Sequence, residues 1–415
     1  MGDFVTGSPG ALSANPDFTA GLLQATLGTA GIQAIVAPAF DGPQVQSYTV
    51  SLGLGVKPEK VEGMAGALAL AAGASMCRVC RAEGKLVVEV PKPEGERKVL
   101  MARRLMGLKT PTAWHVPMGL GTMGQVVWLD LTDDRTAHLV LGGTTGSGKT
   151  NALHWMLFWL LSHNPVTALD LLLLDPKGGE LKPFWRARHL IHPPQSSPRE
   201  IVKVLAWVQA EMARRAQDGT SEPRILVVMD EVRQLVRLEK RVQKYLGSIT
   251  ELGRWLGIHM VVTTQQPGAR SLGDALVNFP CRMLGRVATK TLEYGAAGRA
   301  RSRAGDFLGR GDFLRITVDG VVRLQVPRIL EEDLARLPKT SLQGELPLGE
   351  MVSLGELELA GVDPRGGWNR KRLDEGKVRE AVGNGGSPTT VHQQFGINYY
   401  RAERLVDELG GNGEE

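Results

Sequence analysis

The sequence predicts an α/β protein whose central unit is a parallel β-sheet flanked by helices, with a small folded unit on either side. Short apolar runs alternate with helical patterns along the middle of the chain, which is the order of elements typical of a parallel sheet. One run leads through a glycine-rich turn into a helix, and a second helix has its apolar residues on one face. The predicted strands are His138–Gly142, Leu169–Leu174, Arg224–Met229 and His259–Thr264.

The second of these helices lies between the second and third predicted strands. Its apolar residues recur at the spacing that places them together on one helical face, as on a helix packed against a sheet. They are Ile201, Val204, Leu205, Val208 and Met212.

The composition is that of a globular protein that could bind a polyanion. Of the 415 residues, 42% are hydrophobic and 22% are charged, which excludes a disordered chain. Lys and Arg exceed Asp and Glu by 49 to 44, an excess that allows a nucleic-acid partner without demonstrating one. Three cysteines exclude a disulfide framework and indicate a reducing compartment, the cytoplasm. The longest apolar run, Leu153–Leu161, is far shorter than the ~20 residues of a membrane span.

We expect three folded units joined by irregular segments. Alternation in "PQVQSYTVSLG", an alanine-rich helical pattern in "KVEGMAGALALAAGA" and a hairpin in "CRVCRAEGKLVVEVP" that turns near Glu83 and Gly84 predict a small α/β domain. Glycine and proline without periodicity mark a mobile lead-in and a later linker. The expected boundaries are 1–17 for the lead-in, 18–115 for the small α/β domain, 116–338 for the sheet domain, 339–372 for the linker and 373–415 for a C-terminal domain.

The glycine-rich turn has the pattern of a phosphate-binding loop. "GTTGSGKT" follows a predicted strand, precedes a helix and satisfies G-x-x-x-x-G-K-[ST]. Its glycines let backbone amides face an anion at a helix N-terminus, where the helix dipole favours phosphate. We expect Lys149 to reach the β and γ oxygens of ATP and the Thr150 hydroxyl to bind Mg²⁺. The expected nucleotide-binding residues are Gly143, Thr144, Thr145, Gly146, Ser147, Gly148, Lys149, Thr150 and Asn151.

Two apolar strands end in a carboxylate, at Asp175 and at Asp230. Only Asp230 is followed by a second carboxylate, Glu231. An aspartate at a buried strand end can bind Mg²⁺, and the adjacent glutamate can then polarise the attacking water as general base. The string "PKGGE" after Asp175 instead resembles a loop that leaves the sheet. We therefore expect Asp230 and Glu231 to be the catalytic pair.

The fourth predicted strand ends in "TTQQP". A polar residue at the tip of a strand beside the phosphate loop can sense the γ-phosphate or hold the water, and Gln265 or Thr264 is the candidate. A solvated amide at a strand end is the alternative interpretation of Gln265.

Six strings together resemble the FtsK/SpoIIIE DNA translocases, within the FtsK-HerA group of P-loop motors. They occur in the order found in that family, and the resemblance covers most of the chain from about residue 20. An upstream string, "GPQVQSYTVSLGLGVKPEKVEGMAGALALA", is similar to the small α/β domain that precedes the motor there. The six strings are "HLVLGGTTGSGKT", "LLLLDPKGGEL", "RILVVMDE", "GIHMVVTTQQP", "NFPCRM" and "GDFLGRGDFL".

This resemblance implies a RecA-like motor assembled as a hexameric ring, with double-stranded DNA in the channel and ATP at subunit interfaces. Such an interfacial site normally uses an arginine supplied by the neighbouring subunit. Arg282 is the first choice and Arg286 the second. The family usually has another arginine about a dozen residues beyond Arg282, where this chain has Leu292–Tyr294, so the arginine that acts in trans stays open.

Two regions, together with Lys177 on the loop after the second predicted strand, offer candidate DNA contacts. Residues 299–328 hold seven arginines and three aspartates, which on loops facing a channel would follow DNA phosphates without reading bases. A solvated, salt-bridged surface is the alternative. The string "SPTTVHQQFGINYYRAERLVDELG" has helix-turn-helix spacing and resembles the family's winged-helix domain. Because acidic residues exceed basic ones in this unit and no wing is recognised, docking to another protein is the alternative. The candidates are Lys177, Arg299, Arg301, Arg303 and Arg310 in the channel, and Asn398, Tyr399, Arg401 and Arg404 in the second helix.

The leading functional hypothesis is an ATP-driven double-stranded DNA translocase, either a soluble mobile-element relative or a motor portion of a longer protein. A conjugative or packaging DNA pump is the alternative among motors. A nucleotide-gated DNA-binding or partition switch is the alternative of another class. Hydrolysis rate distinguishes them, because a motor should turn over at about 10 s⁻¹ or faster on DNA and a switch can be far slower.

Overall fold

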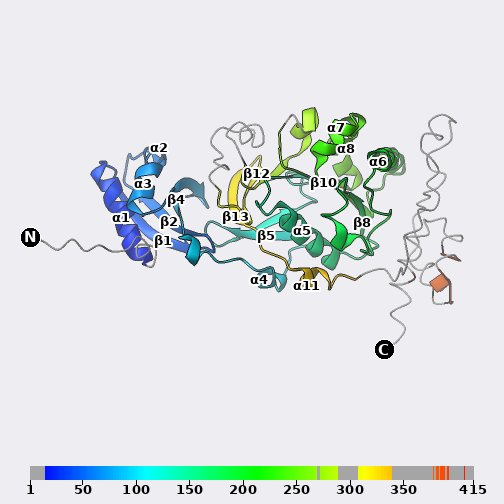
Figure 1. The fold of residues 1–415 in the computed structure, drawn as a ribbon, viewed down its shortest axis with the longest axis horizontal. Coiled ribbons are helices and arrows are strands. Elements are labelled where there is room, and N and C mark those ends of the chain that lie inside the picture. Colours follow the sequence, from blue (N-terminus) through cyan, green and yellow to red (C-terminus); the bar gives the residue numbers. More distant parts are fainter. Residues whose placement is uncertain are drawn as a thin grey trace, which may run out of the picture.

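The computed structural model describes residues 15–268, 272–287 and 307–338, together with isolated positions between 377 and 406. These residues form two β-sheets, one of four strands and one of nine (Figure 1). The four-stranded sheet lies toward the N-terminal end of the molecule with its helices, and the nine-stranded sheet forms the larger layered body. Within the described ranges, no helix has the length and apolar character that a bilayer crossing requires.

The small sheet is antiparallel, in the order β1-β2-β4-β3, and it packs with its helices around a core of its own. Asn15 caps the first helix, because its side chain accepts hydrogen bonds from the amides of Asp17 and Phe18 and a proline follows it. Glu83 and Gly84, with φ of 49° and 71°, turn the predicted hairpin. The elements are α1 (Pro16–Thr29), β1 (Ala34–Asp41), β2 (Val45–Leu52), α2 (Pro58–Glu62), α3 (Ala65–Ala71), β3 (Arg78–Ala82) and β4 (Lys85–Pro91).

Three details of this unit differ from the sequence-based expectation. The first helix begins at Pro16, inside the expected lead-in, and β1 was not predicted at all. The alanine-rich segment forms two short helices, α2 and α3, rather than one. Gly63 lies in the break between them, and glycine lowers the stability of a helix interior.

The large sheet confirms the α/β prediction, but it is mixed rather than wholly parallel. Its order is β6-β5-β13-β12-β11-β7-β10-β9-β8, in which β11, β7, β10, β9 and β8 are parallel. The other four strands pair antiparallel. Short turns join β5 to β6 and β12 to β13 and permit no other pairing there, whereas β11 with β12 and β13 with β5 pair across longer stretches of sequence. The strands are β5 (His115–Gly121), β6 (Val126–Asp130), β7 (His138–Gly142), β8 (Leu169–Leu174), β9 (Arg224–Met229), β10 (Ile258–Thr264), β11 (Cys281–Leu284), β12 (Asp312–Thr317) and β13 (Gly320–Gln325).

The four strands predicted from sequence are β7, β8, β9 and β10. Three have the predicted bounds, and β10 begins one residue earlier, at Ile258. Alternate residues along these strands enter two different cores, one on each face of the sheet. This two-sided burial explains why the strands are continuous apolar runs.

Helices cover both faces of this sheet. On one face lies α5, with nine of its 15 residues buried. On the other lie α6 and α8, and the five apolar residues predicted on one helical face all lie buried there in α6. The helices are α4 (Arg103–Met106), α5 (Lys149–His163), α6 (Pro198–Asp218), α7 (Val232–Leu238), α8 (Arg241–Leu252) and α11 (Glu331–Leu334), with short 3-10 turns at Glu94–Glu96, Lys182–Phe184, Gly253–Leu256 and Gly273–Asn278.

A buried ionic cluster joins the two sheets. Arg323 of β13 donates two hydrogen bonds to the Asp312 carboxylate, at 2.8 and 2.7 Å, and a third to Glu89 of β4. Thr122 donates to the other oxygen of Glu89 at 2.7 Å. Burial acts to raise the pKa of Glu89, but the charges of Arg323 and Arg78 outweigh it and lower that pKa to about 2. The small sheet is thus held on the large one by groups that stay ionised at neutral pH.

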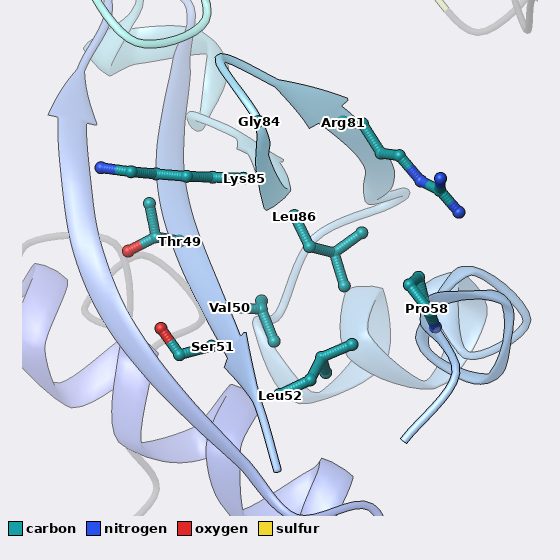
Figure 2. A pocket seen from close by; sticks show the side chains of 9 residues that line it. All are labelled: Thr49, Val50, Ser51, Leu52, Pro58, Arg81, Gly84, Lys85 and Leu86. Atoms are coloured by element: carbon teal, nitrogen blue, oxygen red, sulfur yellow. The ribbon is translucent and has the colours of Figure 1, made fainter. Parts of the chain in front are cut away.

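A cavity of about 470 Å³ opens on the small sheet, lined by residues of β2 and β4 together with Pro58, Arg81 and Gly84 (Figure 2). Arg81 forms an exposed ion pair with Glu59 at 2.9 Å. None of the residues that line this cavity belongs to the phosphate-binding loop or to the acidic pair. The candidate active site therefore lies elsewhere, at the strand ends of the large sheet.

Candidate active site

The predicted phosphate loop, residues 143–150, leaves β7 and enters α5. Gly143, Gly146 and Gly148 all have positive φ, of 154°, 80° and 98°. A Cβ on Gly148 would lie 2.7 Å from the amide nitrogen of Gly311, so only glycine fits there. Gly148 also brings no capping side chain to α5, so the amides of the first helical turn can bind a phosphate.

Two distant segments of the chain support this loop. The amide and hydroxyl of Thr144 both donate to the carbonyl of Arg286, at 2.8 and 3.1 Å. The amides of Arg310 and Gly311 donate to the carbonyls of Gly146 and Ser147, at 3.1 and 2.9 Å. Arg310, a candidate DNA contact, thus lies against the phosphate loop through its backbone while its side chain is exposed.

The side chain of Asn151 has a different set of partners from the one expected of a nucleotide-binding residue. Its Nδ2 donates to the backbone carbonyl of Pro327 at 2.7 Å, and its Oδ1 accepts from the backbone amide of Ile329 at 3.0 Å. These bonds fasten α5 to the segment after β13. A contact between Asn151 and the nucleotide stays a prediction.

Asp230 and Glu231 follow β9, as expected, and both are buried. Burial raises the pKa of Asp230, opposed by the hydrogen bond from Thr263 and the charge of Lys149. Glu231 has a left-handed backbone, with φ of 44°. This conformation is uncommon outside glycine, and it turns the chain sharply between the strand and α7.

Thr263 of β10 holds the acidic pair in place, whereas the residues predicted from sequence at this strand end were its neighbours Thr264 and Gln265. The Thr263 hydroxyl donates to Oδ1 of Asp230 and accepts from the amide of Glu231 at 3.1 Å. The parallel register sets Val262 beside Met229, so Thr263 comes next to Asp230. A polar residue at the carboxyl end of a buried strand was the available signal.

Two lysines approach the same oxygen of Glu231. Oε2 lies 3.6 Å from Nζ of Lys149 and 3.5 Å from Nζ of Lys177, and it accepts no hydrogen bond among the described residues. Oε1 accepts from the amide of Gln265 at 3.4 Å, while the side chain of Gln265 is exposed. Lys177 was expected to contact DNA, and the structure places its ammonium beside the Glu231 carboxylate. A contact between Lys177 and DNA stays a prediction.

The loop that carries Lys177 is fixed by Asp175. The Asp175 carboxylate accepts hydrogen bonds from the amides of Lys177, Gly178 and Leu181, at 3.1, 2.9 and 3.1 Å. Asp175 therefore shapes a loop leaving the sheet, in agreement with the interpretation of its sequence.

The two candidate trans arginines differ in their surroundings. Arg282 lies on β11, donates to the carbonyl of Leu276 at 3.1 Å, and has its pKa lowered by burial. Arg286 is exposed beside the phosphate loop of its own chain. The candidates Arg299, Arg301, Arg303, Asn398, Tyr399, Arg401 and Arg404 lie outside the described residues.

The residues at the strand ends fit Mg²⁺ bound together with ATP. In phosphate sites Mg²⁺ usually takes one or two protein ligands and completes its shell with phosphate oxygens and water. No cluster of three or more His, Cys, Asp or Glu that could hold a metal occurs in the described part of the chain. Asp230 suits such an ion, because a bound cation would stabilise the ionised form that burial disfavours.

Replacing Thr263 with valine should lower ATP turnover by about 10- to 100-fold, the range for losing a hydrogen bond to a charged group. The KM for ATP should change little, since the bonds of Thr263 go to Asp230 and Glu231. Thr263→Ser retains the hydroxyl and should recover most of the turnover. Steady-state kinetics of both variants test this, and a valine variant with wild-type turnover would contradict the positioning role.

Comparison with known proteins identifies two segments of the chain. Residues 12–93 match the model of the FtsK alpha domain, and residues 108–219 match that of the FtsK/SpoIIIE family. The DNA translocase FtsK of Lactiplantibacillus plantarum is 29% identical over 429 residues, covering 94% of this chain and 53% of the relative. The DNA translocase FtsK of Mycobacterium tuberculosis is 26% identical over 423 residues, covering 92% of this chain and 50% of the relative. The chain thus spans about half the length of these curated relatives.

One solved structure supports the fold. The pCW3 conjugation coupling protein TcpA, in its monomer form with ATPγS, is similar over 77% of this chain and 99% of its own, with a TM-score of 0.51. At 18% sequence identity this similarity shows the fold alone.

Proposed function

We propose, from the matches of this chain to the FtsK alpha and FtsK/SpoIIIE family models and from its similarity to DNA translocases, that it is an ATP-driven motor that moves along double-stranded DNA. The observation that carries the proposal is that the phosphate loop after β7 and the paired Asp230 and Glu231 after β9 lie at the ends of strands on either side of β10. That pair supplies both a ligand for Mg²⁺ and a base for hydrolysis. The DNA partner is inferred from the relatives, which are DNA translocases.

In the proposed reaction the amides of the phosphate loop hold the phosphates of ATP, and Lys149 moves from Glu231 toward them. Bound Mg²⁺ would neutralise charge on the phosphate oxygens. Asp230 and the Thr150 hydroxyl would hold that ion. Glu231, set by Thr263 and by the amide of Gln265, takes a proton from the attacking water.

We further propose that the motor works as a hexameric ring in the cytoplasm, with ATP at the subunit interfaces. An arginine from the neighbouring subunit would then stabilise charge on the transferring phosphoryl group. Exposure favours Arg286 for this role, whereas Arg282 has its guanidinium bonded to the backbone of its own chain. Arg310 and Lys177 are the described candidates for contact with DNA.

ATP hydrolysis with and without long duplex DNA tests the proposal, using wild type beside Lys149→Ala. Wild type should reach about 10 s⁻¹ or more on DNA, near ordinary enzyme rates, and should be slower without it. Lys149→Ala should lose this activity. Full activity in Lys149→Ala would contradict the assignment of the phosphate loop, and turnover that stays orders of magnitude slower on DNA would favour a nucleotide-gated switch.

A further inference from the structure

We infer that Lys177 couples DNA binding to ATP hydrolysis by exchanging one negative partner for another. Without DNA its ammonium pairs with the catalytic carboxylate of Glu231. A phosphate of DNA at the same loop draws the ammonium away and frees that carboxylate for the attacking water. This inference rests on the proposed function, and it names the group through which DNA would control the active site.

The first support is the occupancy of the Glu231 carboxylate. Oε1 faces the amide of Gln265, and Oε2 faces the ammonium groups of Lys149 and Lys177. A general base must come within hydrogen-bond reach of the proton that it takes. Glu231 is 7% exposed, so little of the carboxylate remains open to water while both lysines are present.

The second support is that only one of the two lysines leaves when ATP binds. The phosphates draw Lys149 to themselves, as its place in the phosphate loop predicts. Lys177 lies on the loop after β8, outside the phosphate loop, and keeps its contact with Oε2 of Glu231. In the ATP-bound chain it is therefore Lys177 that holds the base.

The third support is that the backbone of the loop after β8 is fixed, whereas the side chain of Lys177 on it can move. The carboxylate of Asp175 fixes the loop backbone through three amides, and Nε2 of His154 lies 2.6 Å from the carbonyl of Glu180. The side chain of Lys177 is 40% exposed on this frame, on a flexible four-carbon stem. Lys177 can thus change partners while the loop stays in place.

The surface around Lys177 is suited to a polyanion. Lys182, five residues further along the same loop, is also exposed. Exposed lysines neutralise DNA phosphates with release of counterions, without regard to base sequence. A partly exposed ion pair such as Lys177 with Glu231 is weak, so a phosphate can compete for the lysine.

The first test measures ATP turnover of Lys177→Met, which removes the charge and retains an unbranched apolar side chain. Turnover without DNA should rise about two- to fivefold, the factor expected from loss of a partly exposed ion pair. The stimulation by saturating DNA should shrink by the same factor. Lys244→Met, at an exposed lysine of α8 outside this surface, is the matched control and should have wild-type turnover without DNA. Lys177→Arg should stay near wild type because it retains the charge.

The second test needs no nucleotide and uses the reciprocity of coupled binding. If Glu231 competes with DNA for Lys177, then Glu231→Gln should raise the affinity of the nucleotide-free chain for duplex DNA, again about two- to fivefold. The same change in the Lys177→Met background should leave the affinity unaltered. Fluorescence anisotropy with a labelled duplex at fixed salt measures all four proteins.

The outcomes separate the two ideas. If DNA stimulates the wild type but Lys177→Met has the DNA-free turnover of wild type, the exchange of partners is wrong and the motor proposal stands. The exchange is also wrong if Glu231→Gln raises DNA affinity equally with and without Lys177. If DNA does not stimulate wild-type hydrolysis at all, the proposed function fails, and the inference fails with it.

Discussion

Glu231→Gln is expected to reduce ATP turnover by roughly 10²- to 10⁴-fold, the usual contribution of a general base. Glutamine retains the size of the side chain and an oxygen for the amide of Gln265, but it cannot take a proton from water. ATP binding should persist, because its main contacts come from the phosphate loop. The variant should therefore accumulate with uncleaved ATP.

Single-turnover hydrolysis and retention of labelled ATP on the variant provide the measurement. Glu239→Gln is the control, since Glu239 lies beyond α7, pairs with Arg241 and has no contact with Glu231 in the structure. Turnover within about twofold of wild type in Glu231→Gln would show that the base is another group. Loss of ATP binding would instead show that Glu231 contributes to the binding of ATP before hydrolysis.

The second large effect is expected on the free energy of unfolding, when the buried ionic cluster between the two sheets is broken. Glu89→Ala should lower the free energy of unfolding by about 3–5 kcal/mol, the usual cost of breaking a buried ion pair from one side. Arg323 would keep Asp312 but lose the carboxylate of the small sheet, and Arg78 and Thr122 would lose theirs. Glu89→Gln retains an acceptor for Thr122 and Arg323 and should cost less.

Chemical denaturation followed by tryptophan fluorescence measures this loss. The seven tryptophans among the described residues, Trp114 to Trp255, belong to the large sheet and its helices, so their signal reports unfolding of that unit rather than of the small sheet. Glu83→Ala is the matched control, because Glu83 also reaches across to the large sheet, through Gln125 at 3.2 Å, but is exposed. It should change stability by less than about 0.5 kcal/mol. Equal losses in Glu83→Ala and Glu89→Ala would contradict the role of the buried cluster.

The parts of the fold that could be predicted are those with a local signal. The phosphate loop is one contiguous string, and its glycines are required by the left-handed backbone that the structure shows. Likewise β7, β8, β9 and β10 are buried on both faces, so each is a plain apolar run. The antiparallel half of the large sheet gave no such signal, because β5 and β13 pair although they come from opposite ends of this part of the sequence.

The same limit applies to the active site. Asp230 and Glu231 could be named because they follow a strand directly. The contacts of Thr263 and Lys177 with this pair could not be predicted, because they depend on the register of β10 beside β9 and on the fold of the loop after β8. Both are non-local contacts that one sequence does not specify.

The claim that this chain is a motor is tested most directly by displacement of a triplex-forming oligonucleotide from long duplex DNA in the presence of ATP. Wild type should displace the oligonucleotide, and Lys149→Ala should leave it bound, because movement requires hydrolysis. Absence of displacement by wild type, in the presence of hydrolysis stimulated by DNA, would contradict translocation and indicate a DNA-binding switch.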